Sequence, residues 1–448
     1  MRMRELNPIK KISGTICVPG DKSIGHRAAL LSLLCCEPVV ITNFPGAADC
    51  QSSLQAVQKL GVSVDVDGNM LRLSPPTSIQ PDPDTLIECG NSGTTARLIS
   101  GIIAGTPIEV TITGDESLSS RPMKRIIDPL TEMGAEIFSD DGHLPLRIRG
   151  GKLISFEYRL PVASAQVKSS LLLAGLASGC SATVREDTIT RNHTEIMIKE
   201  LGGEIQVRDI KPVFMTDPKD PRKRRMQMPE SFKREIVLPQ RAKLIGGEID
   251  IPGDISTGAF FMAASAISGG PLTIENLGLN PTRTAFLDYL KSVGAKVDIS
   301  DRKTVSGEPR GTVTVTGGKL KPRRISGETT VGLIDEIPIV AVIAAFTPGT
   351  TIIRDAAELR VKESDRLEAI AYNLKLMGIK CGVLEDGLAI KGGQELSGAD
   401  FRSFGDHRIA MAFSIASLFA VGPSTIDDES IVEVSCPEFY DLLEKIRG

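Results

Sequence analysis

The sequence predicts an α/β protein with two similar domains, each made of three repeated βαβαββ-like units around buried parallel helices. Three observations support this fold class. The chain has 448 residues, which is too long for one ordinary hydrophobic core. The stretch CVPGDKSIGHRAALL at 17–31 returns as DIPGDISTGAFFMAA at 250–264. A helix–glycine–strand signature also recurs at intervals along both halves.

The recurring signature is an amphipathic segment that ends in glycine and is followed by a short alternating strand. It occurs at 56–66, 129–138, 197–207, 289–299 and 373–383, and the segment 441–448 resembles a sixth copy that stops at its glycine. Glycine is favoured just past a helix end because it tolerates the left-handed backbone conformation. The glycines that mark the six units, three per half, are Gly61, Gly134, Gly202, Gly294, Gly378 and Gly448.

Each unit also contains a second candidate helix, upstream of the amphipathic one, that is apolar or small nearly all round. A helix of this kind is buried on every side. We expect the amphipathic helices and the alternating strands to cover it. These helices are predicted at 23–34, 92–105, 164–179, 256–270, 335–346 and 405–422.

The repeat of 17–31 at 250–264 also predicts where the domains meet. Asp21 corresponds to Asp254, so we expect one domain at 21–240 and a second formed by 1–20 and 241–448. The chain would cross near 20 and near 240, which makes a double hinge, and the first strand in 10–20 would pair near 243–253. The charged, proline-containing run 211–235 is predicted to be an exposed loop or ribbon, and its basic group at 222–225 is not expected to bind nucleic acid.

Composition excludes several function classes. The formal net charge is −4 and aromatic residues make up 4% of the chain, which argues against a nucleic-acid surface. The eight cysteines form no C-x-x-C pair, so we expect reduced, buried thiols and no metal site. We find no signal segment and no apolar run long enough to span a membrane. We therefore expect a cytoplasmic protein, a monomer, without a cofactor.

Polar residues stand at the starts of the otherwise apolar helices. The N-terminus of a buried helix has unpaired N–H groups and partial positive charge, so it attracts anions. Converging helix starts from two facing domains would line one cleft for a small ligand with several negative charges. Only the fourth copy, with Ile255 and Phe260 where the first has Lys22 and Arg27, is expected to serve packing alone. The polar candidates are Lys22, Ser23, Arg27, Asn91, Gly93, Thr94, Arg97, Ser164, Gln166, Lys168, Asp335, Lys362, Glu363, Arg366, Asp406, His407 and Arg408.

Seven motifs in order resemble those of the 5-enolpyruvylshikimate-3-phosphate (EPSP) synthase family. They are PGDKSIGHR, GNSGTTARL, SSRPMKR, SAQVKSSLLLAGL, RNHTEIM, LRVKESDRL and DHRIAMA, and the resemblance covers essentially the whole chain. It implies two inside-out α/β domains. It also implies transfer of the enolpyruvyl group of phosphoenolpyruvate to the 5-hydroxyl of shikimate 3-phosphate, with release of phosphate through a tetrahedral adduct.

The resemblance also implies roles for individual residues. Asp335 would deprotonate the 5-hydroxyl, and either Glu363 or Lys22 would protonate the methylene carbon. Shikimate 3-phosphate would be bound by Lys22, Ser23, Arg27, Ser164, Ala165, Gln166, Arg191, Asp335 and Lys362. Phosphoenolpyruvate would be bound by Lys22, Gly93, Arg121, Gln166, Arg366 and Arg408.

One departure from the family pattern concerns the C-terminus, where Val434 takes the place of a lysine found in the better-known branch, so no role carries over. Arg191 points to the other branch, some of whose members tolerate the herbicide glyphosate. Gly93 nevertheless keeps the small residue that some tolerant members replace with alanine, and we expect glyphosate to bind in the phosphoenolpyruvate site.

Two alternative functions remain at this stage. The UDP-N-acetylglucosamine enolpyruvyl transferases have a catalytic cysteine in a mobile loop, but the corresponding stretch at 114–125 has none. A non-catalytic anion-binding repeat protein would have little use for Asp335 and Glu363 beside the arginine cluster.

Overall fold

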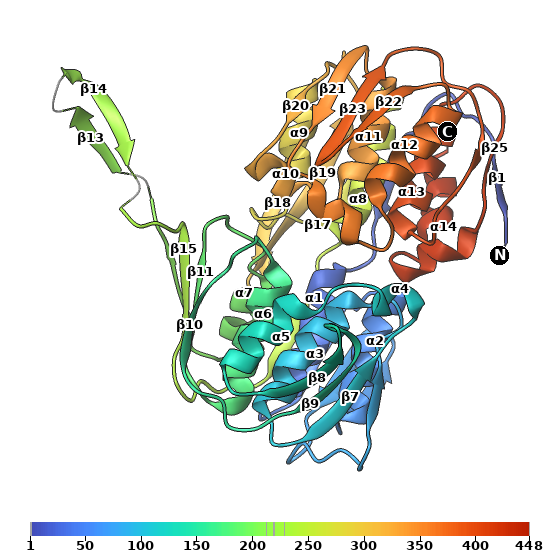
Figure 1. Cartoon of the computed structure of the whole chain (residues 1–448). Helices are drawn as coiled ribbons and strands as arrows, with labels where there is room; N and C mark the ends of the chain where they lie inside the picture. The colour runs from blue at the N-terminus through green and yellow to red at the C-terminus, as the bar shows by residue number, and fades with distance from the viewer. Residues whose placement is uncertain (1, 212, 218–219, 228, 448) are drawn as a thin grey trace.

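The repeated unit predicted from the sequence is present in the structure as a four-stranded sheet with two helices. The computed structural model describes residues 2–447 except 212, 218–219 and 228, and it has two lobes (Figure 1). In the second unit, the first two strands are parallel and the last two are antiparallel to their neighbours, in the order β6-β7-β9-β8. Its elements are β6 (Leu86–Glu88), α3 (Gly93–Gly105), β7 (Glu109–Thr113), α4 (Glu116–Ser119), α5 (Lys124–Glu132), β8 (Glu136–Asp140) and β9 (His143–Arg149).

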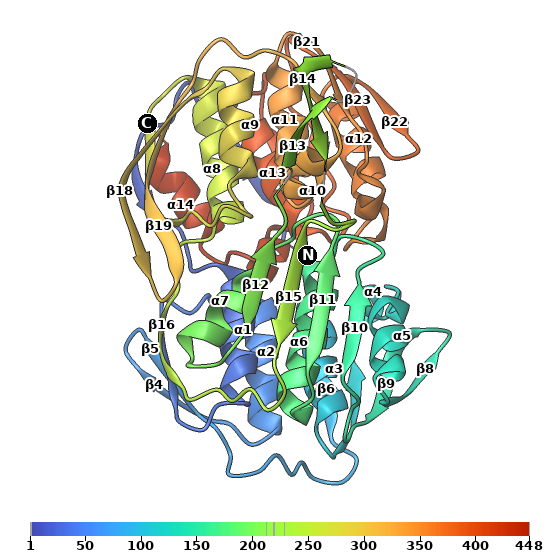
Figure 2. The same cartoon turned by 90° about the vertical axis from the view of Figure 1, so that its left-hand side faces the viewer.

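The third and fifth units repeat this strand order, as β10-β11-β15-β12 and β20-β21-β23-β22. Figure 2 shows the first of these sheets covering α6 on the outside of the N-terminal lobe. The third unit consists of β10 (Phe156–Arg159), α6 (Ala165–Ser178), β11 (Ala182–Glu186), α7 (His193–Glu200), β12 (Gln206–Asp209) and β15 (Arg234–Leu238). The fifth consists of β20 (Arg324–Ile325), α10 (Glu328–Gly332), α11 (Ile337–Phe346), β21 (Gly349–Ile353), the 3-10 helix η1 (Ala357–Val361), α12 (Arg366–Leu376), β22 (Lys380–Leu384) and β23 (Gly387–Gly392).

The first and fourth units exchange their first strands. β2 (Gly14–Cys17) precedes α1 (Lys22–Ser32) in the chain but pairs in parallel with β17 (Leu272–Gly278) of the other lobe. Conversely, β16 (Gly247–Asp250) pairs in parallel with β3 of the first unit. The remaining elements of these units are β3 (Val39–Thr42), α2 (Ala48–Lys59), β4 (Ser63–Asp67), β5 (Met70–Ser74), α8 (Ile255–Ser268), α9 (Ala285–Val293), β18 (Lys296–Val305) and β19 (Glu308–Thr316).

This exchange corrects two predictions about the crossings. The strand in 10–20 does not pair with 243–253, apart from a single bridge between Gly20 and Gly253. The second crossing lies after β16 rather than near 240, because Ile249 and Ile251 are buried in the hydrophobic core of the N-terminal lobe. The first 18 residues contribute to the core of the C-terminal lobe, as expected. We therefore propose domains at about 19–252 and at 1–18 with 253–448.

The sixth unit is completed by the N-terminal segment. β1 (Arg4–Leu6) pairs antiparallel with β25, which gives the order β1-β25-β24. The other elements of this unit are β24 (Asp400–Phe401), α13 (His407–Ser417), β25 (Ser424–Ile426), the 3-10 helix η2 (Glu429–Val434) and α14 (Phe439–Ile446).

Two further sequence predictions concern the helix ends and the charged run. The glycines that end the first five amphipathic segments all have positive φ, from 83° to 108°, as predicted, and Gly448 lies outside the described residues. β13 (Val213–Asp217) and β14 (Asp220–Gln227) form the predicted ribbon, which projects from the N-terminal lobe in Figure 1. The side chains at 222–225 lie outside the description, so their function stays a prediction.

The six central helices are buried along most of their length, as predicted: α1, α3, α6, α8, α11 and α13. Small residues let them approach closely. A Cβ at Gly101 of α3 would lie 2.1 Å from the carbonyl oxygen of Ser170 on α6, so only glycine fits there. Among the described residues, no helix combines the length and apolar character needed to cross a membrane.

The strand exchange predicts how fragments of the chain behave. A fragment 19–252 retains β16, whereas a fragment 21–240 loses it and exposes the edge of β3. We expect the shorter fragment to be less stable by roughly 3 kcal/mol or more, since it loses the burial of Ile249 and Ile251. Urea unfolding of both fragments measures this difference. Equal unfolding free energies would show that β16 is not part of the N-terminal domain.

Candidate active site

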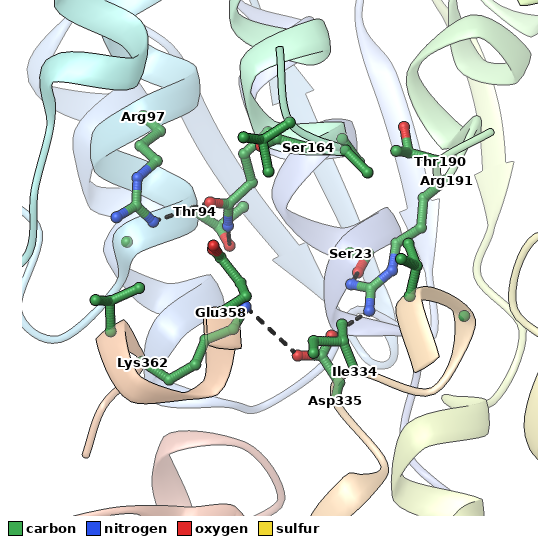
Figure 3. Close-up of a pocket in the computed structure, with 18 of the residues that line it drawn as sticks. Ser23, Thr94, Arg97, Ser164, Thr190, Arg191, Ile334, Asp335, Glu358 and Lys362 are labelled. Carbon is green, nitrogen blue, oxygen red and sulfur yellow. Dashed lines mark hydrogen bonds and ion pairs between the residues drawn. The ribbon is translucent and has the colours of Figure 1, made fainter. Parts of the chain in front are cut away.

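A cavity of about 600 Å³ lies between the two lobes, and residues of both lobes line it. Figure 3 shows Ser23, Thr94, Ser164 and Arg191 of the N-terminal lobe facing Asp335 of the C-terminal lobe. The segments that reach the cavity are mainly the starts of the central helices.

Three central helices of the N-terminal lobe begin at the cavity. Their N-cap side chains accept hydrogen bonds from backbone N–H groups of the first turn: Asp21 from Ile24 at 3.1 Å, and Ser92 from Thr95 at 3.2 Å. Ser164 caps α6 in the same way. The remaining free N–H groups and the helix dipoles make this wall of the cavity favourable for anions. The lining residues at these helix starts are Lys22, Ser23, Gly93, Thr94, Ala165 and Gln166.

The C-terminal lobe also contributes helix starts. Asp406 caps α13 and Asp365 caps α12 through side-chain hydrogen bonds. Asp335 stands two residues before α11. These segments supply carboxylates, cations and one histidine to the cavity: Asp335, Lys362, Glu363, Arg366, His407 and Arg408.

Ion pairs between the lobes cross the cavity. Arg191 pairs with Asp335. Arg121 Nη1 lies 3.7 Å from Glu363 Oε1, and Arg125 Nη1 lies 2.7 Å from Glu358 Oε1. In each pair, the cation comes from the N-terminal lobe and the carboxylate from the C-terminal lobe. The protein's own carboxylates therefore neutralise cations that an anionic ligand would otherwise meet.

Asp335 is surrounded by positive charge. Besides Arg191, Lys362 Nζ lies 3.9 Å and Arg366 Nη1 3.8 Å from its carboxylate, and Arg408 donates to its backbone oxygen at 2.8 Å. Burial alone would raise the pKa of Asp335, but the charges of Arg191 and Arg408 outweigh burial and hold that pKa well below its ordinary value. Asp335 is therefore ionised at neutral pH.

Glu363 is held by two arginines. Arg366 Nη2 donates to Glu363 Oε2 at 2.6 Å, and Arg121 approaches from the other lobe. Burial alone would raise the pKa of Glu363, but the charge of Arg366, followed by others including that of Arg121, keeps the pKa well below its ordinary value. Arg366 is itself fixed, because its side chain is 1% exposed and its Nε donates to Asp406 at 2.7 Å.

Lys22 pairs with Asp49 of α2, whose Oδ2 lies 2.7 Å from Lys22 Nζ. Burial alone would lower the pKa of Lys22, but Asp49 outweighs this effect and raises the pKa. Lys22 is therefore a full positive charge in the cavity. Within the described part of the chain, no group of three or more His, Cys, Asp and Glu side chains is arranged to hold a metal ion.

Comparison with known proteins identifies the family. The family model for EPSP synthase (3-phosphoshikimate 1-carboxyvinyltransferase) matches residues 6–230 and 226–443. The 3-phosphoshikimate 1-carboxyvinyltransferase of Desulforamulus reducens is 40% identical over 446 residues, which cover 98% of each chain. That of an Anaeromyxobacter species is 42% identical over 449 residues, which cover 99% of this chain and 96% of the relative. The chain belongs to the EPSP synthase family.

A solved structure supports the same family at the level of the fold. The structure of EPSP synthase from Acinetobacter baumannii matches with a TM-score of 0.82 at 35% identity, and the match covers 100% of this chain and 98% of that one. The resemblance seen in the seven motifs is thus confirmed, as is the fold class. Membership of the EPSP synthase family also favours enolpyruvyl transfer to shikimate 3-phosphate over the two alternative functions considered from the sequence.

The residues that the EPSP synthase motifs single out meet at the cavity, with one exception. The exception is Arg27. The predicted site residues that line the cavity are Lys22, Ser23, Gly93, Arg121, Ser164, Ala165, Gln166, Arg191, Asp335, Lys362, Glu363, Arg366 and Arg408.

Arg27 lies behind the cavity wall rather than in it. Its guanidinium donates to the Ser23 carbonyl oxygen at 2.8 Å, to Thr194 Oγ1 at 2.8 Å and to Ser169 Oγ at 2.9 Å. Because Arg27 stands one turn after Ser23, its side chain runs back beside the first turn of α1. Burial, followed by the charge of Arg191, lowers the pKa of Arg27 to about 10. In this structure Arg27 therefore contacts α1, α6 and α7 instead of lining the cavity.

Several charged residues that line the cavity had no role assigned from the sequence. Arg97 is a helix-start candidate, and its Nη1 donates to Gln166 Oε1 at 2.9 Å. Arg125, the last residue of the SSRPMKR motif, also lines the cavity, as do Asp49 and Glu358. Asp49 stands on an amphipathic helix and Glu358 on a 3-10 helix, where a charged side chain looks like an ordinary solvent-facing one, so the pattern held no signal for these two.

The prediction that the fourth unit serves packing alone was wrong. Asp254 lines the cavity and caps α8, where it accepts a hydrogen bond from Ser256 N at 2.8 Å. Arg283 Nη2 lies 3.4 Å from Asp254 Oδ1 and 3.8 Å from Asp21 Oδ2 of the other lobe. Ile255 and Phe260 do pack in the core. Asp21 and Asp254, which occupy equivalent positions in the two copies of the turn, nevertheless both lie near one buried cation, Arg283. Burial and the charge of Asp21 raise the pKa of Asp254 to about 6.

The charge environment of Asp335 predicts a pH-dependent stability effect. Because the folded-state pKa of Asp335 is lowered, its contribution is fully present above the unfolded pKa near 3.8 and is lost as the pH falls through the folded value. We expect Asp335→Asn to unfold at a lower temperature than the wild type at pH 7. The difference in unfolding temperature between the variant and the wild type should become smaller below about pH 4. Thermal unfolding of both proteins from pH 7 to pH 2.5 measures this difference.

Asp65→Asn, a change at an exposed aspartate on β4, is the matched control and should leave the unfolding temperature unchanged at every pH. A gap for Asp335→Asn that stays constant down to pH 2.5 would mean that the loss is not linked to the charge.

Proposed function

We propose that this protein transfers the enolpyruvyl group of phosphoenolpyruvate to the 5-hydroxyl of shikimate 3-phosphate and releases phosphate. The observation that supports this most is the cavity between the lobes, where two carboxylates, Asp335 and Glu363, lie among cations from both lobes. Two polyanionic substrates need such cations, and addition of an alcohol to an enol phosphate needs an acid and a base. We also propose that the protein is a cytoplasmic monomer, as expected from its sequence.

The substrates divide the cavity between them in this proposal. Shikimate 3-phosphate lies against the N-terminal lobe, at the starts of α1 and α6, and reaches Asp335 through its 5-hydroxyl. Its ligands are Lys22, Ser23, Ser164, Ala165, Gln166, Arg191, Asp335 and Lys362, with Arg27 acting through the backbone of Ser23. Phosphoenolpyruvate lies between the lobes against Lys22, Gly93, Arg121, Gln166, Arg366 and Arg408.

The reaction proceeds by addition and then elimination. In the addition, Asp335 takes the proton of the 5-hydroxyl while the oxygen attacks C2 of phosphoenolpyruvate and an acid delivers a proton to C3. In the elimination, C3 loses a proton, the C2–C3 double bond forms again, and the C–O bond to phosphate breaks. Arginine and lysine side chains already in place stabilise the charge on the leaving phosphate and on the carboxylate.

The ion pairs in the cavity explain how binding prepares Asp335 and Glu363. With these ion pairs in place both carboxylates are ionised, which makes Asp335 a weak base and leaves Glu363 without a proton to donate. When phosphate and carboxylate groups of the substrates pair with Arg121, Arg366 and Arg408, less positive charge is left to stabilise the carboxylates of the protein. The pKa of each then rises toward the range useful for catalysis.

Two candidates for the acid remain, Glu363 and Lys22. Glu363 needs the rise in pKa described above. Lys22 already carries a proton, but Asp49 stabilises the charged form and makes the proton harder to give up. Variants at the two positions distinguish them, because only loss of the acid stops exchange of solvent deuterium into C3 of phosphoenolpyruvate.

Phosphate release from a mixture of phosphoenolpyruvate and shikimate 3-phosphate tests the proposal. We expect wild-type protein to release phosphate only when both substrates are present. Asp335→Asn and Glu363→Gln should bind both substrates but lower kcat by about 10²–10⁴, the range for loss of an acid or base. Calorimetry checks binding of each substrate. No phosphate release by the wild type would reject the function, and unchanged kcat in the variants would reject the two roles.

The close approach at Gly93 predicts an effect on inhibition by glyphosate. A Cβ at Gly93 would lie 2.8 Å from Arg97 Nη1 and 3.5 Å from Arg121 Nη1, so alanine has to displace the guanidinium of Arg97. We expect Gly93→Ala to weaken inhibition by glyphosate, a more extended molecule than phosphoenolpyruvate, by about tenfold or more. The KM for phosphoenolpyruvate should rise less, and the KM for shikimate 3-phosphate should not change. Inhibition curves measure this, and full wild-type activity in millimolar glyphosate would show that it does not bind.

A further inference from the structure

The loop between β11 and α7 carries two polar cavity residues, Thr190 and Arg191, beside the apolar Ile189. Figure 3 shows both of them on the N-terminal side of the cavity, with Arg191 extended toward Asp335. Arg191 Nη1 also lies 3.3 Å from Ser23 Oγ, which it reaches as a hydrogen-bond donor. The position of this loop therefore decides where the guanidinium of Arg191 lies.

A single buried ammonium holds both ends of that loop. Lys168 on α6 is fully buried, and its Nζ lies 3.1 Å from Glu186 Oε1 and 2.8 Å from Glu195 Oε1. Glu186 is the last residue of β11, and Glu195 lies in the first turn of α7. The two carboxylates thus flank the loop, and Lys168 joins them at its base.

Glu186 also grips the loop directly beside Arg191. Its Oε1 accepts hydrogen bonds from Thr190 N at 3.3 Å and from the Thr190 hydroxyl. Burial raises the pKa of Glu186, while Lys168 and the Thr190 hydroxyl act in the opposite direction. Without Lys168, Glu186 would take up a proton more readily, and a protonated carboxyl group is a poorer acceptor for the two Thr190 donors.

The residue after Lys168 holds the far side of the same loop. Ser169 Oγ and Thr194 Oγ1 lie 2.7 Å apart, and both accept from Arg27. Thr194 and Glu195 are neighbours on α7, so two adjacent residues of α6 fix the start of that helix. Arg234 is another buried cation near the two glutamates, but it pairs with Asp209.

We propose that Lys168 is a positioning residue for Arg191: by bridging Glu186 and Glu195 it fixes the 187–192 loop and thereby sets the affinity for shikimate 3-phosphate. This inference rests on the proposed function of the cavity. Stability alone is a weak reason for the arrangement, because a buried ion pair contributes little compared with apolar side chains of similar size. Lys168 itself does not line the cavity, although Ser164, Ala165 and Gln166 of the same SAQVKS motif do.

The test compares substrate binding in variants of the full chain. We expect Lys168→Met, which keeps the length but removes the charge, to raise the Kd and KM for shikimate 3-phosphate by about tenfold or more. The KM for phosphoenolpyruvate and kcat should stay within about threefold. Lys168→Arg should recover part of the affinity. Lys199→Met, at an exposed lysine of α7, is the matched control and should change nothing.

A double-mutant cycle separates positioning from general structural damage. In an Arg191→Ala background, Lys168→Met should raise the Kd for shikimate 3-phosphate by less than about twofold, because the guanidinium that Lys168 positions is gone. An equal effect in both backgrounds, or a loss of kcat at unchanged KM, would overturn the proposal. Calorimetry with shikimate 3-phosphate alone measures binding in each variant without turnover. If the proposed function is wrong, the wild type itself does not bind shikimate 3-phosphate.

A second variant covers the case in which Lys168→Met does not fold. Lys168→Met with Glu195→Gln removes one charge of each sign and leaves the region with the same net charge. We expect it to fold, as judged by thermal unfolding, and still to bind shikimate 3-phosphate about tenfold more weakly. Loss of folding in both variants would also overturn the proposal, because Lys168 would then be required by the fold rather than by the ligand.

Discussion

The structure depends on the concentration of positive charge where the central helices of both lobes begin. Each buried helix brings free N–H groups and a partial positive charge to its N-terminus, and lysine and arginine side chains add full charges at the same places. A cavity with this much positive charge is unfavourable without a counter-charge. Four carboxylates of the protein itself supply it: Asp335, Glu363, Glu358 and Asp49. The carboxylates are therefore as much a part of this electrostatic design as the cations.

Because three of these ion pairs join the lobes, ligand binding, lobe contact and protonation are linked. A substrate anion that takes up Arg121 competes with Glu363 for the same guanidinium. The displaced carboxylate then loses stabilisation of its charged form and its pKa rises. In the proposed mechanism, this shift in pKa prepares the acid and the base once substrate is bound.

The sequence predicts the features that local rules determine. The repeats, the glycines with positive φ and the buried helices follow from short-range patterns, and the recurring polar helix starts include many of the charged residues that line the cavity. The sequence placed the first strand with the second half, but it did not reveal that β2 pairs with β17 and β16 with β3, because the two strands precede near-identical turns and their pairing is decided by distant partners. The same reason hides Arg283, whose importance depends on two aspartates brought together only in the folded chain.

The exchanged strands also explain why the fourth unit keeps its polar turn. Both crossings pass at the bridge between Gly20 and Gly253, where a Cβ at Gly20 would lie 2.1 Å from the Asn43 carbonyl oxygen. Asp21 and Asp254 follow these glycines directly, and Arg283 lies between them. The two crossings of the chain are thus held at one tight point, and Lys22, which pairs with Asp49, stands directly after Asp21. The fourth unit therefore keeps its aspartate because Asp21 and Asp254 share Arg283 beside this bridge.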